Sequence, residues 1–97
     1  MASILKTAQA GTLESSDIMI SVTPGLEGSG VIIEVESIVM AQYGDDIRLT
    51  LEQTVAEQEC TDLYIKALDR GALDCTIRAR ILTALVRAGA VLKEAIL

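Results

Sequence analysis

Two adjacent serines, Ser15 and Ser16, are the residues best suited to covalent chemistry. They belong to the polar segment Gly11-Thr12-Leu13-Glu14-Ser15-Ser16-Asp17, directly before an alternating apolar stretch that begins at Ile18. A serine hydroxyl acts as a catalytic nucleophile only when a base activates it, and the chain has no histidine. An exposed serine can still accept a group from another enzyme's transferase. Residue types alone favour a simpler interpretation, in which the two serines are only polar residues that precede a strand.

The alternating pattern also predicts where the two serine side chains point. Residues at every second position of a strand share one face. If the strand extends back from Ile18, Ser15 falls on the solvent face with Asp17, whereas Ser16 falls on the buried face with Ile18. We therefore expect Ser15 to be exposed and Ser16 to point inward.

The remaining residue types exclude several kinds of site. Without histidine, the chain lacks the commonest general acid–base and the commonest metal ligand. Its two cysteines, Cys60 and Cys75, are not in a CxxC spacing, so we expect no metal site. No imidazole is available to activate either thiol. We expect both cysteines to be reduced and partly buried, with Cys75 at a helix core position, as in a cytoplasmic protein.

Charge is distributed unevenly along the chain, whose formal net charge is −6. Residues 1–62 contain eleven acidic and two basic residues, whereas residues 63–97 contain three acidic and six basic residues. The acidic part would repel a phosphate backbone, and the two aromatic residues, Tyr43 and Tyr64, cannot build a stacking platform. We therefore expect no nucleic-acid partner. An acidic surface favours solubility and also suits basic protein partners.

The length of 97 residues predicts a single domain over residues 1–97. Hydrophobic residues make up 51% of the chain, which is enough for an aliphatic core. Residues 1–10 show little periodicity and are expected to form a mobile arm. Residues 1–7 lack an apolar h-region, so we expect no secretory signal, and the longest apolar run, residues 88–92, is too short to cross a bilayer. We expect a soluble, cytoplasmic protein without a membrane partner.

Two strands and a helix are predicted in the first part of the chain. Alternation predicts strands over residues 18–23 and 31–36, and a hairpin of these two strands is the simplest topology. A four-residue spacing then predicts one face of a helix: Val39, Tyr43, Ile47, Leu51 and Val55. Either one helix runs through a weak point at Gly44, which we favour, or Asp45 caps a new helix.

A third strand and a second helix are predicted in the remainder. Residues 63–67 alternate, Asp69-Arg70-Gly71 reads as a turn, and apolar residues at helical spacing follow from about Asp74 to Gly89. Residues 90–97 form a C-terminal extension, and their apolar spacing leaves open whether the second helix continues into it.

The predicted elements run in the order β-β-α-β-α. This order indicates an α+β fold, a two-layer sandwich in which both helices cover one face of a small sheet. The first helix is then a crossover between strands that are expected to be parallel. The other face of the sheet should be exposed to solvent, because the alternation of the strands places several polar residues on it: Asp17, Ser21, Glu34, Glu36 and Lys66.

Three separated segments match one known family in order. They are residues 10–17 (AGTLESSD), 43–48 (YGDDIR) and 69–80 (DRGALDCTIRAR). With them the chain resembles the acyl carrier protein (gamma chain) of citrate lyase over about residues 8–88. Three ordered matches are more specific than any one alone. They favour a functional role for Ser15 over a plain strand entry.

This resemblance implies a carrier and not an enzyme. The family's carrier serine matches Ser15 and bears 2′-(5″-phosphoribosyl)-3′-dephospho-CoA through a phosphodiester, which would make the chain a phosphoprotein. The implied partners are a holo-acyl-carrier synthase, which transfers the group from a triphosphoribosyl precursor, and the citrate lyase alpha and beta subunits. The alpha subunit exchanges acetyl for citrate, and the beta subunit cleaves the citryl thioester to oxaloacetate. A divalent metal expected in the beta step would belong to that subunit.

Other interpretations stay open on the sequence alone. The acyl carrier subunits of citramalate lyase and malonate decarboxylase resemble this family and use the same kind of arm. An unmodified α+β interaction domain explains the predicted elements but not the three ordered matches. Arg78 and Arg80 could contact phosphates of the arm, although a solvated helix face is the simpler interpretation of both.

Overall fold

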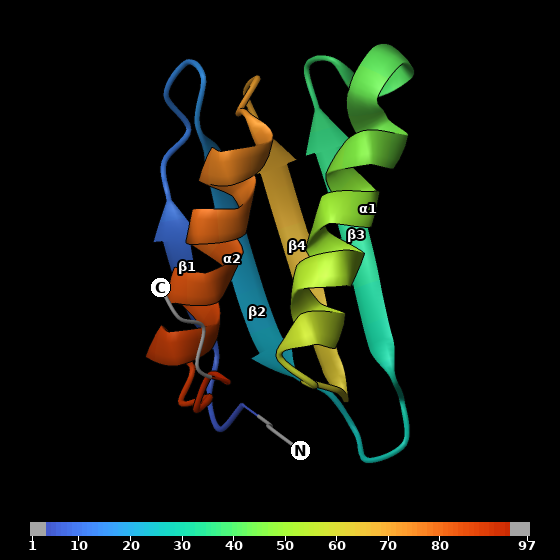
Figure 1. The fold of residues 1–97 in the computed structure, drawn as a ribbon, viewed down its shortest axis with the longest axis vertical. Coiled ribbons are helices and arrows are strands. Elements are labelled where there is room, and N and C mark those ends of the chain that lie inside the picture. Colours follow the sequence, from blue (N-terminus) through green and yellow to red (C-terminus); the bar gives the residue numbers. More distant parts are fainter. Residues whose placement is uncertain (1–3, 94–97) are drawn as a thin grey trace.

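A four-stranded sheet with two helices on one of its faces forms the protein (Figure 1). The structure, a computed structural model, describes residues 4–93. In chain order the elements are β1 (Ala8–Gly11), β2 (Ile18–Pro24), β3 (Val31–Ser37), α1 (Met40–Glu57), β4 (Leu63–Asp69) and α2 (Asp74–Arg87). The predicted α+β sandwich with both helices on one face is confirmed, with β1 preceding the expected elements.

The strands lie side by side in the order β1-β2-β4-β3. β2 is antiparallel to both β1 and β4, whereas β3 is parallel to β4. Helix α1 joins β3 to β4, so it is the expected crossover between parallel strands. The C-terminal ends of β3 and β4 and the start of β2 consequently meet at one edge of the sheet, where Ile18 and Ser37 both align with Asp69.

The predicted hairpin between residues 18–23 and 31–36 is wrong, because β4 lies between β2 and β3. Two strand spacings amount to about 10 Å, a gap that the six residues 25–30 span easily. Asp62 stabilises this connection: its carbonyl accepts from Gly25 N (2.7 Å), and its Oδ1 accepts from Gly30 N (3.0 Å). Alternation identifies a strand but does not identify its neighbour.

The predicted mobile arm is also wrong for residues 4–10, which pack onto the fold. Ile4 is buried in the core, and the amides of Leu5 and Lys6 both donate to Ala88 O, at 2.8 and 3.2 Å. Residues 8–11 then form the edge strand β1 beside β2. This strand depends on tertiary pairing, because its sequence, AQAG, lacks the β-branched and aromatic residues that favour strands. Residues 1–3 lie outside the described part.

Helix α1 is continuous through Gly44, as the favoured prediction has it. A Cβ at Gly44 would lie 2.6 Å from Met40 Cε, so the glycine makes room for the side chain one turn before it. Helix α2 ends in a Schellman motif, in which Gly89 has φ +102° and Ala90 N donates to Leu85 O (2.9 Å). Residues 90–93 therefore leave the helix, and residues 94–97 lie outside the described part.

The core lies between the sheet and the two helices. Helix α2 packs on β1 and β2, whereas α1 packs on β3 and against α2. The largest fully buried side chains come from both layers: Ile18, Ile20, Leu51, Leu63, Ile65, Ile77, Ile81 and Leu85. Within residues 4–93, neither helix combines the length and apolarity that a bilayer crossing would need.

Candidate functional site

Ser15 lies at the tip of the turn that joins β1 to β2. Asp17 N donates to Glu14 O (3.1 Å), which closes a four-residue turn with Ser15 and Ser16 at its centre. Both serine side chains are exposed. The Ser15 hydroxyl forms no hydrogen bond with any other residue of the part that the structure describes. Its predicted exposure is confirmed, although it follows from the turn and not from strand alternation.

The prediction that Ser16 points inward is wrong. Its φ of +66° is left-handed, so the chain reverses direction here and strand parity no longer applies. Its amide donates to Arg70 O (2.8 Å), and Arg70 N donates to Asp17 O (2.9 Å). These two bonds fasten the serine turn to the segment between β4 and α2.

Asp17 anchors the turn to helix α2. It does not lie on the solvent-exposed face of the sheet, where it was expected. Its carboxylate forms a bidentate ion pair with Arg80 on α2, at 3.0 Å to Nε and 2.8 Å to Nη2. Thr12 Oγ1 and the Ile18 amide also donate to it, each at 2.7 Å. The Asp17 side chain is only 13% exposed. Four donors to one carboxylate thus connect both sides of the turn to the helix layer.

The same contacts shift the titration of both ionic partners. Hydrogen bonds from Arg80, and then from Thr12 and the Ile18 amide, hold the pKa of the Asp17 carboxyl well below its usual range. The bond to Asp17 likewise raises the pKa of Arg80. The expectation of a solvated face is therefore wrong for Arg80. Arg78 instead pairs with Glu57 at the surface.

Gly11 permits the close approach of the two strands below the turn. Its φ is +97°, and a Cβ built on it would lie 1.8 Å from Ile18 O. No rearrangement of a side chain can relieve a contact with backbone. Gly28 has a similar φ of +84°, but a Cβ there would meet nothing within 4 Å.

This contrast predicts unequal costs for two glycine-to-alanine changes. Gly28→Ala should lower the free energy of unfolding by about 1–2 kcal/mol, the usual cost of left-handed backbone in a residue with a side chain. Gly11→Ala should lower it clearly more, because the strands must also move apart. Urea denaturation of both variants measures the difference. Equal losses would show that β1 and β2 separate without cost.

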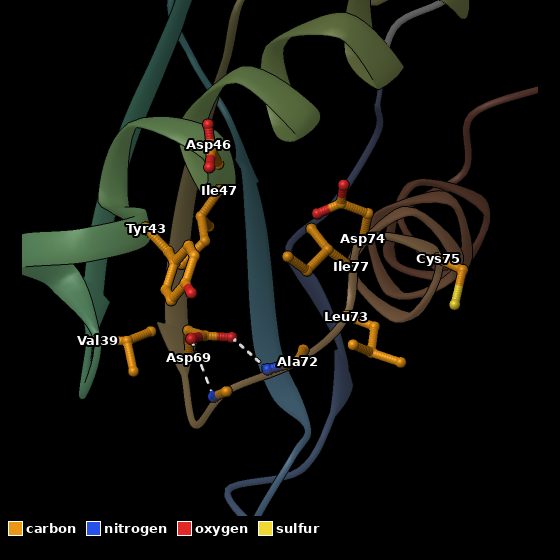
Figure 2. Close-up of a pocket in the computed structure, with 11 residues that line it drawn as sticks. Val39, Tyr43, Asp46, Ile47, Asp69, Ala72, Leu73, Asp74, Cys75 and Ile77 are labelled. Carbon is orange, nitrogen blue, oxygen red and sulfur yellow. Dashed lines mark hydrogen bonds between the residues drawn. The ribbon is translucent and has the colours of Figure 1, made fainter.

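A cleft opens between the N-terminal ends of the two helices, and we call it the helical cleft (Figure 2). It has a volume of about 690 Å³ and is lined by apolar residues together with Asp46, Asp69 and Asp74. Asp69 shapes its floor, because its carboxylate accepts from Gly71 N (2.9 Å) and from Ala72 N (3.0 Å).

Cys75 borders the helical cleft and is exposed, so its predicted position in the helix core is wrong. The buried stripe of α2 begins two residues later, at Ile77. Two residues rotate a helix by about 200°, which turns Cys75 away from the core. Cys60 is buried as expected, and loss of hydration raises the pKa of its thiol. Both cysteines are free.

A second, smaller hollow lies next to the serine turn, at the C-terminal ends of β3 and β4. It has a volume of about 460 Å³, and we call it the Leu13 hollow. Its lining includes Leu13 from the turn, Ile38 and Leu68 as apolar walls, and Glu36, Asp69 and Arg70 as charged groups. Within residues 4–93, no three His, Cys, Asp or Glu side chains gather as a metal site would require.

Comparisons with known proteins show which family this chain is similar to. A family profile described as malonate decarboxylase delta subunit (MdcD) matches residues 5–88. The citrate lyase acyl carrier proteins of Streptococcus uberis and Halothermothrix orenii are each 47% identical over 85 residues, which cover 88% of this chain and 82% and 88% of theirs. That of Streptococcus mutans serotype c is 46% identical over 88 residues, 91% of this chain and 85% of its own.

One chain of a solved structure shares the fold. It belongs to the crystal structure of a Pseudomonas malonate decarboxylase hetero-tetramer in complex with malonate, with a TM-score of 0.75 and 22% identity over 92% of this chain and 93% of that one. The relatives at 46–47% identity assign the family more narrowly. The chain belongs to the citrate lyase acyl carrier protein family, whose members are carrier subunits and not catalysts.

Proposed function

We propose that this chain is the acyl carrier subunit of citrate lyase, a single carrier domain that holds 2′-(5″-phosphoribosyl)-3′-dephospho-CoA on Ser15 Oγ through a phosphodiester. The placement of Ser15 supports this most directly. Its hydroxyl is exposed and has no hydrogen-bond partner within residues 4–93, at the tip of a turn fastened to both layers of the fold.

The surroundings of Ser15 leave room for a large group. The turn projects into solvent, and its other central residue, Ser16, is exposed as well. Asp17 is the nearest acid in the interior of the fold. Because Arg80 forms an ion pair with it, Asp17 presents no unpaired negative charge to an incoming phosphate. A bulky phosphodiester can therefore form on Ser15 without displacing any contact of the turn.

The attachment reaction places a requirement on the synthase. Ser15 Oγ attacks the phosphorus that is bonded to the ribose of the triphosphoribosyl precursor, a new O–P bond forms, and pyrophosphate leaves. The hydroxyl proton must go to a base. Asp17 cannot serve, because its oxygens already accept hydrogen bonds from Arg80, Thr12 and Ile18, and because a carboxylate of such low pKa is a weak base. The synthase therefore supplies the base.

When bound, the group supplies a terminal thiol for acetyl and citryl thioesters, which the alpha and beta subunits exchange and cleave, so that citrate yields acetate and oxaloacetate. The chain's own residues fix the root of the arm. Anchoring Ser15 through Asp17 and Gly11 limits the volume that the arm explores, which raises the concentration of its end at both partner sites. Two free cysteines suit a reducing cytoplasm.

A carrier of malonate decarboxylase is the second candidate. The match of residues 5–88 to the delta-subunit profile and the shared fold support it. Citrate lyase acyl carrier proteins are 44–47% identical to this chain, which favours citrate. Citramalate lyase differs in the acyl group, which the partner subunits select.

Intact mass spectrometry tests the proposal. The protein is co-expressed with the holo-acyl-carrier synthase and the enzyme that makes its precursor, and is then cleaved after Glu14 to isolate the serines. We expect an added mass equal to phosphoribosyl-dephospho-CoA on Ser15. Unmodified protein under these conditions would overturn the carrier assignment in favour of an unmodified interaction domain.

A further inference from the structure

We propose that the Arg70 guanidinium binds the phosphates at the root of the group on Ser15, and that the Leu13 hollow seats the adjoining part of that group. This inference rests on the proposed function, since it takes the modification of Ser15 as given. It assigns a binding site on the carrier itself and a role to a residue outside the turn.

The backbone holds Arg70 directly beside the serine turn. Arg70 O accepts from Ser16 N (2.8 Å), and Arg70 N donates to Asp17 O (2.9 Å). Ser16 and Asp17 thus both lie opposite Arg70, as in a β-bulge, in which two residues of one strand face a single residue of the other. Ser15 directly precedes this bulge, so a phosphate on its hydroxyl comes within reach of the Arg70 side chain.

The Arg70 side chain is exposed, and within residues 4–93 it forms neither an ion pair nor a hydrogen bond. The two arginines considered from sequence are both occupied, Arg78 by Glu57 and Arg80 by Asp17. Arg87 donates to Gln9 O instead. Arg70 is therefore the arginine beside Ser15 that remains available for a ligand.

The chemistry of the two cavities decides between them. A guanidinium offers paired N–H donors that match phosphate oxygens. The Leu13 hollow contains Arg70 together with two acids, Glu36 and Asp69, and apolar walls. The helical cleft is larger and shares Asp69 with the Leu13 hollow, but it adds Asp46 and Asp74 and the described residues of its lining include no cation, so it would repel a group that carries several phosphates. Charge therefore places the root of the arm in the Leu13 hollow.

Nuclear magnetic resonance of apo and holo wild-type protein tests the inference without an activity assay. We expect the Arg70 side-chain Nε–H resonance to shift on loading, together with the amides of Leu13, Ile38 and Leu68. These shifts should shrink as salt is added, because salt screens an exposed ionic contact. Amide shifts centred on Tyr43 and Leu73, in the helical cleft, would overturn the proposal.

Arg70→Gln and a matched control, Lys66→Gln, complete the test. Both changes remove one exposed positive charge from the same strand region, but Lys66 stands in mid-strand, away from the turn. We expect Arg70→Gln to abolish most of the loading-dependent shifts in the Leu13 hollow and Lys66→Gln to preserve them. Equal effects of the two variants would overturn the proposal.

Mass spectrometry separates this inference from the proposed function. Wild-type protein that gains no adduct on Ser15 contradicts the function itself. Wild-type protein that gains the adduct while Arg70 Nε–H stays unshifted contradicts only the binding site. If Arg70→Gln cannot be loaded, the wild-type Arg70 resonance still decides.

Discussion

Replacing Ser15 with alanine will abolish covalent loading completely and leave the fold unchanged. The Ser15 side chain is exposed and bonds to nothing else in residues 4–93, so its loss should change the free energy of unfolding by no more than about 0.5 kcal/mol. Alanine lacks the hydroxyl oxygen on which the phosphodiester is proposed to form. Intact mass after co-expression with the synthase measures loading, and urea denaturation measures stability.

Ser16→Ala is the matched control for this prediction. Ser16 is the neighbouring exposed serine. Its backbone has a φ of +66°, and alanine and serine are about equally strained there because both have a Cβ. We expect this variant to load fully. An adduct that persists in Ser15→Ala, or that moves to Ser16, would show that the turn and not one hydroxyl determines the modification.

The unloaded Ser15→Ala protein should also distinguish binding to the partner subunits from the turnover of citrate. Because its surface is unchanged, it should still bind the partner subunits and compete with the loaded carrier for them. A complex that assembles but does not turn over citrate is the expected outcome. If the variant supports turnover, an unmodified interaction domain becomes the better description.

Much of the secondary structure could be predicted because single elements have local periodicity. The four-residue spacing from Val39 to Val55 identifies α1, and the alternation of residues 18–23 identifies β2. The pairing of strands has no such local signal. A chain of six residues can return beside its own strand or cross a third one, and the contacts of Asp62 that select the crossing are visible only in the fold.

The local geometry around Ser15 could be predicted only in part, for a related reason. The sequence resemblance points to Ser15, but strand parity misplaced Asp17 and Ser16, because parity holds only while the backbone stays extended. A left-handed residue at Ser16 breaks the alternation. The ion pair between Asp17 and Arg80 joins residues that are 63 positions apart, which no local pattern encodes. Gly11, the first residue of the polar segment, is the sequence signal for a close approach of the two strands.

The Asp17–Arg80 pair should dominate the acid stability of the site. Its removal in Arg80→Met leaves a carboxylate that is 13% exposed without its strongest donor, so we expect a marked loss of stability at pH 7. The contacts lower the folded pKa of Asp17 below its unfolded value of about 3.9. The stabilisation is therefore complete above the unfolded pKa and is lost as the pH falls toward the folded pKa.

The gap in unfolding free energy between wild type and Arg80→Met should consequently be widest at neutral pH and should narrow below about pH 4. Arg78→Met is the control, because it removes the same charge from the same helix but breaks a surface pair whose side chains are 45% and 52% exposed. Such pairs contribute less than about 1 kcal/mol. Amide exchange at Ser16 should accelerate in Arg80→Met alone, because only that change releases the turn from α2. Parallel pH profiles for wild type and Arg80→Met would mean that Asp17 keeps its low pKa without Arg80, and that Thr12 and the Ile18 amide suffice to hold the turn.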